Sequence, residues 1–434
     1  MKVLMFGWEF PPHISGGLGT ACLGLTKAMI NIGEEILFVM PKINGEAVSD
    51  DLFHLMGASD VEVTRSRREM LRDVSPETIR FLEVDSTLRP YLNEVTYQTW
   101  LKEQVNYNES VVEARYEDQK IGKFEFSGVY GPQLMDEVAR YALVAAQLAG
   151  QEQFDVIHAH DWMTYVAGVE AKKISGKKLV CHIHATEFDR SGEHPNTEIF
   201  EIEKYGLQNA DRVLAVSHRT RDIVIRCYDL DPAKVHVVHN AVSKDVTVQR
   251  AQVKRNLDEK IVLFLGRVTG QKGPDYFVQA ARKVVDQVPN VRFVMAGSGD
   301  LWPRMVERIA RERLQKHFHF TGFLRGSDVE DMFAMSDVYV MPSVSEPFGI
   351  TPFEAVLYGT PVIISKQSGI AEIFENAEKV DFWDVDRLTE SIVNLLTDEE
   401  YANNMAINAT RELELINWDG AANKVAAHYK EVTA

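Results

Sequence analysis

The chain has 434 residues, which exceeds what one hydrophobic core usually supports and therefore predicts two domains. Hydrophobic residues make up 45% of the chain and charged residues 26%, proportions that are typical of a soluble globular protein. The formal net charge of −17 argues against nucleic acid or an anionic membrane as the main partner. A local basic pocket can still bind an anionic small molecule.

The N-terminus and the cysteines indicate a cytoplasmic protein. Met1 leads directly into a predicted strand without a signal peptide, and no apolar run approaches membrane-spanning length, so we expect no stable membrane insertion. The three cysteines, Cys22, Cys181 and Cys227, lack metal-ligand spacing. We interpret them as buried free thiols, which suits a reducing compartment.

Short apolar runs alternate with helical patterns along the whole chain. Predicted strands cover residues 2–7, 35–41, 155–160, 178–184 and 212–217 in the first half, and 260–266, 291–297, 317–323, 338–343 and 361–365 in the second. Helical patterns fall between most of them, at 17–32, 161–174, 274–287 and 301–314. Continuous apolar runs suit parallel strands covered on both faces. The alternation predicts α/β, doubly wound, Rossmann-like architecture.

This pattern starts twice, at residue 2 and again at residue 260, with a polar linker near residues 240–258. We therefore predict Rossmann-like domains over residues 1–245 and 246–415, facing a central cleft. Residues 416–434 read as one amphipathic helix that either caps the second domain or crosses back to the first. Residues 44–128 are rich in charge and lack the alternation, so we predict a solvated helical insertion; a lid or binding element over the cleft is the alternative.

The segment LFLGRVTGQKG, residues 263–273, combines a strand end with two cations and three glycines. Arg267 and Lys272 follow the strand, at the edge where open α/β sheets bind ligands. A guanidinium and an ammonium group five residues apart on one loop can converge on a diphosphate. Two unrelated surface cations are the alternative, but the position between glycines at a strand end favours anion binding.

The segment SEPFGITPFEA, residues 345–355, follows another buried strand. Thr351 and Pro352 are typical of a helix cap followed by proline at the first helical position, with Gly359 just past the helix end. Such a helix N-terminus would direct three backbone amides toward phosphate or sugar oxygens: those of Phe348, Gly349 and Ile350.

Two carboxylates flank this loop. Glu346 lies within it, and Glu354 lies one turn into the predicted helix. Carboxylates bind sugar and ribose hydroxyls well because they only accept hydrogen bonds. We therefore predict that one acid contacts a reacting sugar and the other a ribose.

In the first half, HISGGLGTA runs from strand to helix through Gly16 and Gly17, and such turns permit close backbone approach to phosphates. The segments HAHDW and HIHATEFDRSG place four histidines near strand ends, including His160 and His184. In each H-x-H pair both members point to one face of the strand. No cysteine or third ligand motif accompanies them, so we predict a polar cleft wall and no metal site.

Together these motifs resemble retaining nucleotide-sugar glycosyltransferases of the two-Rossmann GT-B fold, and among them bacterial and archaeal glycogen synthase-like enzymes. The resemblance is carried by GGL at 16–18, HAHDW at 158–162, HIHATE at 182–187, GRVTGQKG at 266–273, GSGD at 297–300, and E-x₇-E at 346–354. It covers essentially the whole chain, with residues 44–128 least matched. G-R-x₄-K together with E-x₇-E is highly specific for the superfamily.

The resemblance implies a retaining hexosyltransferase that needs no metal and no cofactor. It would move a hexose, expected to be glucose, from ADP-glucose or UDP-glucose to a saccharide acceptor, expected to be an α-glucan. Residues 1–245 would form the acceptor side and residues 246–415 would bind the nucleotide sugar.

The resemblance also implies roles for individual residues. Arg267 and Lys272 would hold the diphosphate and stabilise it as leaving group. Glu346 would contact the donor sugar, Glu354 the ribose, and His184 would lie by the anomeric carbon. The further implied donor-binding residues are Gly16, Gly17, Phe323, Leu324, Phe348, Gly349, Ile350 and Thr351, with Phe323 and Leu324 bordering the base. The implied acceptor-side residues are His160, Asp161 and Glu187.

Two positions depart from the glycogen synthase pattern. Ile14 stands where the lysine of K-x-G-G-L is usual, which leaves ADP and UDP donors both open, and the linker reads HNAVSK in place of N-G-V-D. Two D-x-D pairs, Asp229/Asp231 and Asp384/Asp386, are interpreted as loop carboxylates because this fold does not rely on them.

Other functions remain alternatives. They are a GT-B disaccharide synthase, a mannosyltransferase acting on a glycan or lipid carrier, and a nucleotide-sugar epimerase. A non-enzymatic nucleotide-sugar-binding regulator is expected to have lost one cation of the diphosphate clamp, whereas Arg267 and Lys272 are both present.

Overall fold

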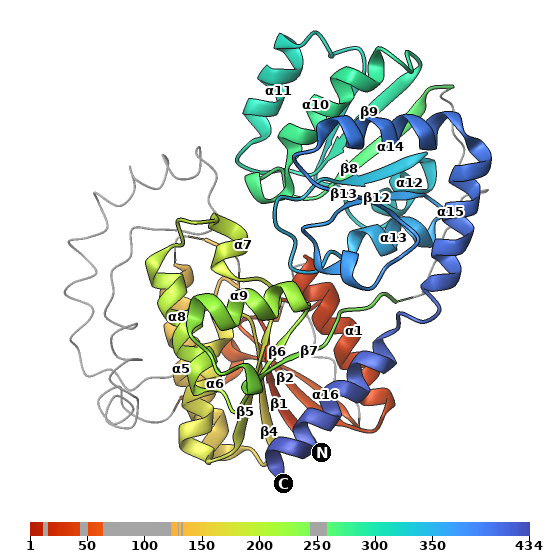
Figure 1. The fold of residues 1–434 in the computed structure, drawn as a ribbon. Helices are drawn as coiled ribbons and strands as arrows, with labels where there is room; N and C mark the ends of the chain where they lie inside the picture. Colours follow the sequence, from red (N-terminus) through yellow and green to blue (C-terminus); the bar gives the residue numbers. More distant parts are fainter. Residues whose placement is uncertain (12–15, 44–50, 64–122, 129, 132, 244–257) are drawn as a thin grey trace, which may run out of the picture. The chain divides into compact units, whose positions relative to one another are not determined.

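The computed structural model describes residues 1–434 except 12–15, 44–50, 64–122, 129, 132 and 244–257 (Figure 1). The described residues form two compact units. The first comprises Met1–Val216, Thr220–Val238 and Trp418–Ala434, and the second comprises Ser217–Arg219 and His239–Asn417. The expected boundary between residues 245 and 246 lies outside the described residues.

A parallel sheet forms the centre of the first unit, with described strands in the order β3–β2–β1–β4–β5–β6–β7. All pairs of described strands are parallel, and the order in which strands are added along the chain reverses between β1 and β4, as in doubly wound folds. Its strands are β1 (Lys2–Phe6), β2 (Glu35–Met40), β3 (Phe53–Gly57), β4 (Val156–His160), β5 (Lys178–Ile183), β6 (Arg212–Ala215) and β7 (Val235–Val237).

Helices cover both faces of this sheet, with α1 and α16 on one face and α5, α6 and α8 on the other (Figure 1). They are α1 (Gly17–Asn31), α5 (Leu134–Gln151), α6 (Trp162–Ser175), α7 (Glu187–Ser191), α8 (Thr197–Asn209), α9 (His218–Tyr228) and α16 (Trp418–Thr433), with short 3₁₀ turns η1 (Ala58–Asp60) and η2 (Pro232–Lys234). Helices α1 and α16 pack side by side at Gly24, where a Cβ atom would lie 2.3 Å from the Trp418 ring.

The second unit repeats the plan with described parallel strands in the order β10–β9–β8–β11–β12–β13. The strands are β8 (Lys260–Leu265), β9 (Val291–Ala296), β10 (Phe318–Gly322), β11 (Val338–Met341), β12 (Val362–Ser365) and β13 (Glu378–Val380). The helices are α10 (Pro274–Val285), α11 (Trp302–Arg311), α12 (Ser327–Met335), α13 (Thr351–Leu357), α14 (Val385–Thr397) and α15 (Glu399–Glu412), with η4 (Gly270–Lys272) and η5 (Gly369–Glu372).

The predicted architecture is confirmed: all ten predicted strands are present, each within one or two residues of its expected ends. Three short edge strands, β3, β7 and β13, were not predicted. Strand β3 also corrects the prediction of a helical insertion over residues 44–128, because residues 53–57 extend the sheet beside β2. The rest of that insertion lies mostly outside the described residues.

The C-terminal helix α16 buries the apolar side that the sequence predicts, including Trp418, Val425 and Tyr429. It belongs to the first unit. All three cysteines are free thiols; Cys22 and Cys181 are buried and Cys227 is half-buried. In the described part of the chain, no helix combines the length and apolar character needed to cross a membrane.

Candidate active site

Glycines shape the turn after β8 that carries Arg267 and Lys272. Gly273 adopts a left-handed conformation, with φ of 69°, where it begins α10, and a Cβ atom there would lie 2.1 Å from the carbonyl oxygen of Pro342. The Val344 amide donates to the Gln271 carbonyl at 2.9 Å. This turn therefore packs backbone against backbone on the loop that follows β11, which only glycine allows.

That packing brings two predicted catalytic residues into contact. The Lys272 Nζ atom forms an ion pair with Oε2 of Glu346, which also accepts a hydrogen bond from the Ser343 hydroxyl at 3.2 Å. The Lys272 side chain is 21% exposed and that of Glu346 is 8% exposed. Arg267 is exposed on the same turn and donates to Gln271 Oε1 at 3.3 Å. Arg267, Lys272 and Glu346 together carry a net positive charge.

The backbone around Glu346 is held by the loop after β12. The Glu346 amide donates to the Gln367 carbonyl at 3.0 Å, and the Glu346 carbonyl accepts from Gly369 at 2.9 Å. The Ile370 amide donates to the Phe348 carbonyl at 2.8 Å. A Cβ atom at Gly369 would lie 2.2 Å from the Pro347 carbonyl oxygen, so this approach also requires glycine. The carboxylate of Glu346 is thus fixed by backbone contacts on both sides of its residue.

The predicted cap of α13 is wrong by one residue. The helix is capped by Ile350, not Thr351, and no side chain caps it. The Ile350 carbonyl accepts from the amides of both Phe353 and Glu354, at 2.9 and 3.2 Å, so the first turn closes without the Thr351 hydroxyl. Pro352 is tolerated there because amides in a first turn have no intrahelical partner. Gly359, with φ of 76°, follows the helix end as predicted.

The amides of Phe348, Gly349 and Ile350 donate to no acceptor among the described residues. Gly349 has φ of 97°, a conformation that favours glycine. The loop therefore presents consecutive backbone donors beside the carboxylate of Glu346. These donors match the prediction for ligand oxygens, which itself stays a prediction.

Glu354 is partly exposed, yet its carboxyl group is largely removed from water. Burial raises the pKa of this carboxyl to about 7. No described residue forms an ion pair or hydrogen bond with its side chain. An acceptor that lacks a partner in a poorly solvated position is suited to the hydroxyls of a ligand.

The predicted base-binding residues follow β10. Phe323 is 58% exposed, an unusual fraction for a phenylalanine, and the Arg325 guanidinium lies 5.4 Å from the centre of its ring. Leu324 is half-buried beside it. An exposed ring at the carboxyl edge of the sheet offers a stacking surface for a planar group.

The sequence did not single out three residues that support the Glu346 loop. Arg219 donates from its guanidinium to the Ser345 hydroxyl at 3.0 Å. The Arg219 amide also donates to Glu372 at 2.7 Å, and Glu372 accepts from the His239 ring at 2.9 Å. Arg219 and His239 each lie more than a hundred positions from the loop and from Glu372. No local motif could have revealed them.

In the first unit, Gly16 caps α1 and Gly17 begins it, and a Cβ atom at Gly17 would meet nothing within 4 Å. The carboxylate of Glu9 accepts a hydrogen bond from the Gly19 amide at 3.2 Å and another from the Tyr130 hydroxyl. A protein carboxylate therefore already occupies part of the first turn of α1. The sequence analysis did not identify Glu9.

The four histidines form a stacked cluster on the face of the sheet that α1 and α16 cover. His158 and His160 stack 4.2 Å apart on β4, and His182 and His184 stack 4.5 Å apart on β5 and just beyond it. Burial lowers the pKa of every ring, that of His184 to about 3. The prediction of a polar cleft wall is wrong for His158, His160 and His182, which are at most 1% exposed, because their shared face packs under helices.

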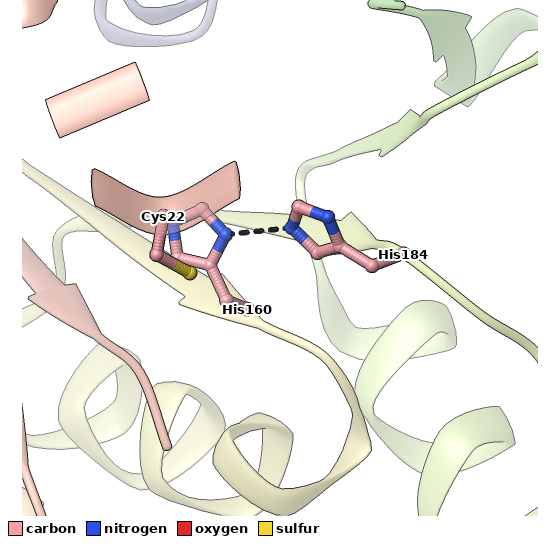
Figure 2. A group of neighbouring side chains, drawn as sticks. All are labelled: Cys22, His160 and His184. Atoms are coloured by element: carbon pink, nitrogen blue, oxygen red, sulfur yellow. Dashed lines mark hydrogen bonds between the residues drawn. The ribbon is translucent and has the colours of Figure 1, made fainter. Parts of the chain in front are cut away.

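His184 is partly exposed, and its Nε2 atom lies 3.0 Å from Nδ1 of His160 (Figure 2). Figure 2 also shows Cys22 of α1 beside His160. One ligand atom of each of these three residues lies within 4.8 Å of the others. No local motif could reveal this grouping, because Cys22 and His160 are 138 positions apart.

Asp161 and Glu187 are buried and engaged by the protein. Asp161 has φ of 61° and accepts from the His184 amide at 2.6 Å, so it fixes the backbone that carries this histidine. Burial raises the Asp161 pKa to about 7, although the His184 amide opposes this shift. Glu187 accepts from Arg190 at 2.8 Å and from Ser191 at 2.5 Å. Both carboxylates organise the loop after β5.

Three of the four D-x-D carboxylates lie at helix starts, whereas Asp229 follows the end of α9. Asp231 accepts from the Ala233 amide at 2.9 Å at the start of η2, and Asp384 accepts from the Arg387 amide at 2.9 Å at the start of α14. Asp386 pairs with Lys283 at the surface. Asp386 lies in the first turn of α14, so the interpretation as a loop carboxylate is wrong for this residue.

Comparison with known families gives two matches. Residues 245–412 match the family described as glycosyl transferases group 1, and residues 114–246 match glycosyltransferase family 4. Together the matches span residues 114–412, more than half of the chain.

Among curated proteins, an uncharacterised glycosyltransferase of Methanocaldococcus jannaschii is 27% identical, over 99% of this chain and 98% of its own. A glycogen synthase of Mycobacterium tuberculosis is 22% identical, over 99% of this chain and 94% of its own. Both relatives therefore align with nearly the full length of the chain.

Among solved structures, a sucrose-phosphate synthase of Thermosynechococcus elongatus superposes with a TM-score of 0.71 at 16% identity, covering 99% of this chain and 98% of its own. HepE of Anabaena, in complex with UDP and glucose, superposes with a TM-score of 0.67 at 18% identity, covering 99% of this chain and 100% of its own. At these identities the likeness is one of fold.

Proposed function

Since the chain is a glycosyltransferase of the GT-B fold, we propose that it transfers glucose from a nucleoside-diphosphate sugar to a saccharide, with retention of anomeric configuration. The acceptor that we propose is an α-glucan, as in glycogen synthase. We propose that the transfer requires no metal and takes place in the cytoplasm.

The arrangement of Arg267, Lys272 and Glu346 after β8 and β11 carries this proposal. Two cations lie on one turn at the carboxyl edge of a parallel sheet, where such folds bind ligands. A diphosphate needs positive charge beside it most when it departs, because negative charge then develops on the oxygen that joined it to the sugar. Arg267 and Lys272 would therefore stabilise the transition state more than the bound donor, which is the requirement for catalysis.

In this proposal Glu346 acts on the sugar side of the diphosphate. Its ion pair with Lys272 and the backbone contacts on both sides hold the carboxylate within the loop. The neighbouring amides of Gly349 and Ile350 would donate to sugar hydroxyls. Glu346 would then orient the sugar or stabilise positive charge at its anomeric carbon as the diphosphate leaves.

Two features support binding of the nucleoside part of the donor. The carboxyl of Glu354 lacks a protein partner and can accept hydrogen bonds from two ribose hydroxyls. The exposed ring of Phe323 can stack against a base. The likeness to a structure that holds UDP and glucose supports a glucose donor; we propose UDP-glucose and ADP-glucose as the donors to test first.

Glycogen synthase is the relative that favours an α-glucan acceptor, because the similarity spans nearly the whole of both chains. The likeness to sucrose-phosphate synthase keeps a disaccharide synthase as the second candidate. No residue described at this site specifically favours a mannosyltransferase or an epimerase.

A matrix of donors and acceptors tests the proposal. ADP-, UDP- and GDP-sugars are each combined with glycogen, small sugars or lipid carriers, and release of nucleoside diphosphate is measured. We expect release with a glucose donor to depend on glycogen, and nuclear magnetic resonance to show an α-linked product. Conversion of the donor without any acceptor would instead identify an epimerase, and transfer to a small sugar alone would identify a disaccharide synthase.

A further inference from the structure

The buried histidine cluster of the first unit holds polar atoms that the protein leaves unsatisfied. Five of its ring nitrogens have no hydrogen-bond partner among the described residues: His158 Nε2, His160 Nε2, His182 Nδ1, His182 Nε2 and His184 Nδ1. Each unsatisfied polar atom in a protein interior costs free energy, because it loses the hydrogen bond that it makes with water. Four stacked imidazoles with so few hydrogen-bond partners are therefore a costly arrangement for a sheet core.

One corner of the cluster has the composition of a metal site. Cys22, His160 and His184 each direct a ligand atom into a region where these atoms lie within 4.8 Å of one another (Figure 2). A thiol and two imidazoles are the ligand types that zinc prefers, and three protein ligands leave a fourth position open. We propose that Cys22, His160 and His184 bind one divalent zinc ion.

This corner is favoured over the neighbouring trio of His158, His160 and His182. The Nδ1 atom of His158 is engaged by the Tyr429 hydroxyl, and all three of those rings are buried. By contrast, His184 is partly exposed, which gives the ion a route of entry.

Zinc can bind here with every proton accounted for and without any further reactant. The thiol of Cys22 releases its proton to solvent and binds as a thiolate. The hydrogen bond between His160 Nδ1 and His184 Nε2 contains one proton, which moves to the other nitrogen of the ring that carries it. Both facing nitrogens then offer lone pairs to zinc, and each imidazole stays neutral.

The site has a consequence that rests on the proposed function. His184 is the residue that we place beside the anomeric carbon of the donor. A zinc ion on His184 would withdraw that ring from the sugar, so bound zinc inhibits transfer and is not part of the catalytic step. Zinc removal is then expected to preserve activity.

Metal binding is tested first, without any assay of activity. The full chain, purified without a histidine tag, is loaded with zinc chloride, dialysed against a weak chelator and analysed for metal. We expect about one zinc ion per chain. Loading with Co²⁺ instead should give a thiolate-to-cobalt absorption band in the near ultraviolet. A protein that retains no zinc, or shows no thiolate-to-cobalt band, would overturn the site.

Variants then assign the ligands. Cys22→Ser and His160→Gln should each weaken zinc binding roughly tenfold or more. Cys181→Ala is the matched control, because this thiol is equally buried on β5, alternates to the opposite face from His182, and contacts the Gly206 carbonyl. Zinc binding that survives Cys22→Ser, or that Cys181→Ala reduces to the same extent, contradicts the assignment.

A separate measurement addresses inhibition. Zinc should slow transfer by the unmodified chain, and Cys22→Ser should need roughly tenfold more zinc for the same fractional loss of its own zinc-free rate. Zinc that binds at Cys22 without slowing transfer would overturn the inhibitory role. If no donor supports transfer, the proposed function fails, while zinc retention and the cobalt spectrum still decide the metal site.

Discussion

The two units begin with the same local plan, a strand, a glycine-bearing turn and a helix, yet the turns have opposite charge. After β8 the turn carries Arg267 and Lys272 and packs through Gly273 on a neighbouring backbone. After β1 the turn brings the carboxylate of Glu9 onto the amide of Gly19. The first turn is therefore already partly filled by an anion, whereas the second presents cations. A glycine-rich turn permits close approach of a phosphate, but the side chains around it decide whether an anion binds.

The largest expected effect concerns the cationic turn. Replacing Arg267 or Lys272 with Ala removes a contact that strengthens as the diphosphate leaves. Turnover at saturating donor should fall by on the order of 10²-fold or more for each variant. Lys283→Ala is the control, since this lysine pairs with Asp386 at the surface of the same unit. Near-normal turnover in either site variant would remove the leaving-group role.

Substitution of Glu346 and of Glu354 should affect different quantities, the first kcat and the second nucleotide affinity. Glu346→Gln should lower kcat strongly while the affinity for free nucleoside diphosphate stays equal or increases, because Lys272 loses its anionic partner. Glu354→Gln should weaken that affinity by about 1.5–3 kcal/mol, because an ionised acceptor of two hydroxyls is lost. Calorimetry and steady-state kinetics on both variants measure this. Equal loss of nucleotide affinity in both would show that the two roles are misassigned.

The pH dependence of nucleotide binding sharpens the role of Glu354. Burial raises the pKa of this carboxyl to about 7, so its ionised fraction increases between pH 6 and pH 8. If the carboxylate accepts the ribose hydroxyls, affinity for the nucleoside diphosphate should increase over this window. The diphosphate also titrates nearby, so Glu354→Gln serves as the reference. An identical pH profile in both proteins would exclude Glu354 from the binding site.

Substitution of Gly273 and of Gly17, one glycine from each turn, should change the free energy of unfolding by different amounts. Gly273→Ala forces a side chain into a left-handed conformation and against the Pro342 carbonyl, and should destabilise the protein by roughly 2 kcal/mol or more. Gly17→Ala meets open space at the start of α1 and should change stability by less than about 1 kcal/mol. Urea unfolding of both variants checks this. A larger loss at Gly17 would mean that the first turn is the tighter one.

The smallest expected effect is that of a chelator. Arg267 and Lys272 already supply positive charge to the diphosphate, so excess chelator should leave transfer unchanged or, if zinc is bound at Cys22, raise it. Rates measured before and after chelation, with Mg²⁺ or Mn²⁺ added back, test this. Loss of activity that Mg²⁺ or Mn²⁺ restores would contradict the metal-free proposal.

The strands and their parallel pairing could be predicted because long apolar runs are strong local signals. The edge strands were not predicted because β7 and β13 are three residues long and β3 alternates buried and half-buried positions within a charged stretch. Arg267, Lys272 and Glu346 could be predicted from their motifs. Their direct contact could not, because it depends on the packing of Gly273 against the loop after β11.

Contacts between distant segments were the least predictable part of the candidate site. Cys22 reads as an ordinary helix residue, and only the packing of α1 over β4 brings its thiol to His160. Likewise Thr-Pro alone predicts a cap at Thr351, but Ile350 closes the first turn with its carbonyl. Local sequence specifies the elements, whereas the site depends on which loops meet.

Helix α16 has a consequence for the order in which the chain folds. Residues 418–434 are synthesised after the whole of the second unit, yet they complete the first. Until then the Gly24 face of α1 lacks the Trp418 ring, and His158 lacks the Tyr429 hydroxyl. During translation the second unit can fold with all its segments available, while the first keeps part of one sheet face uncovered until α16 emerges. The half that is synthesised first is thus the half that matures last.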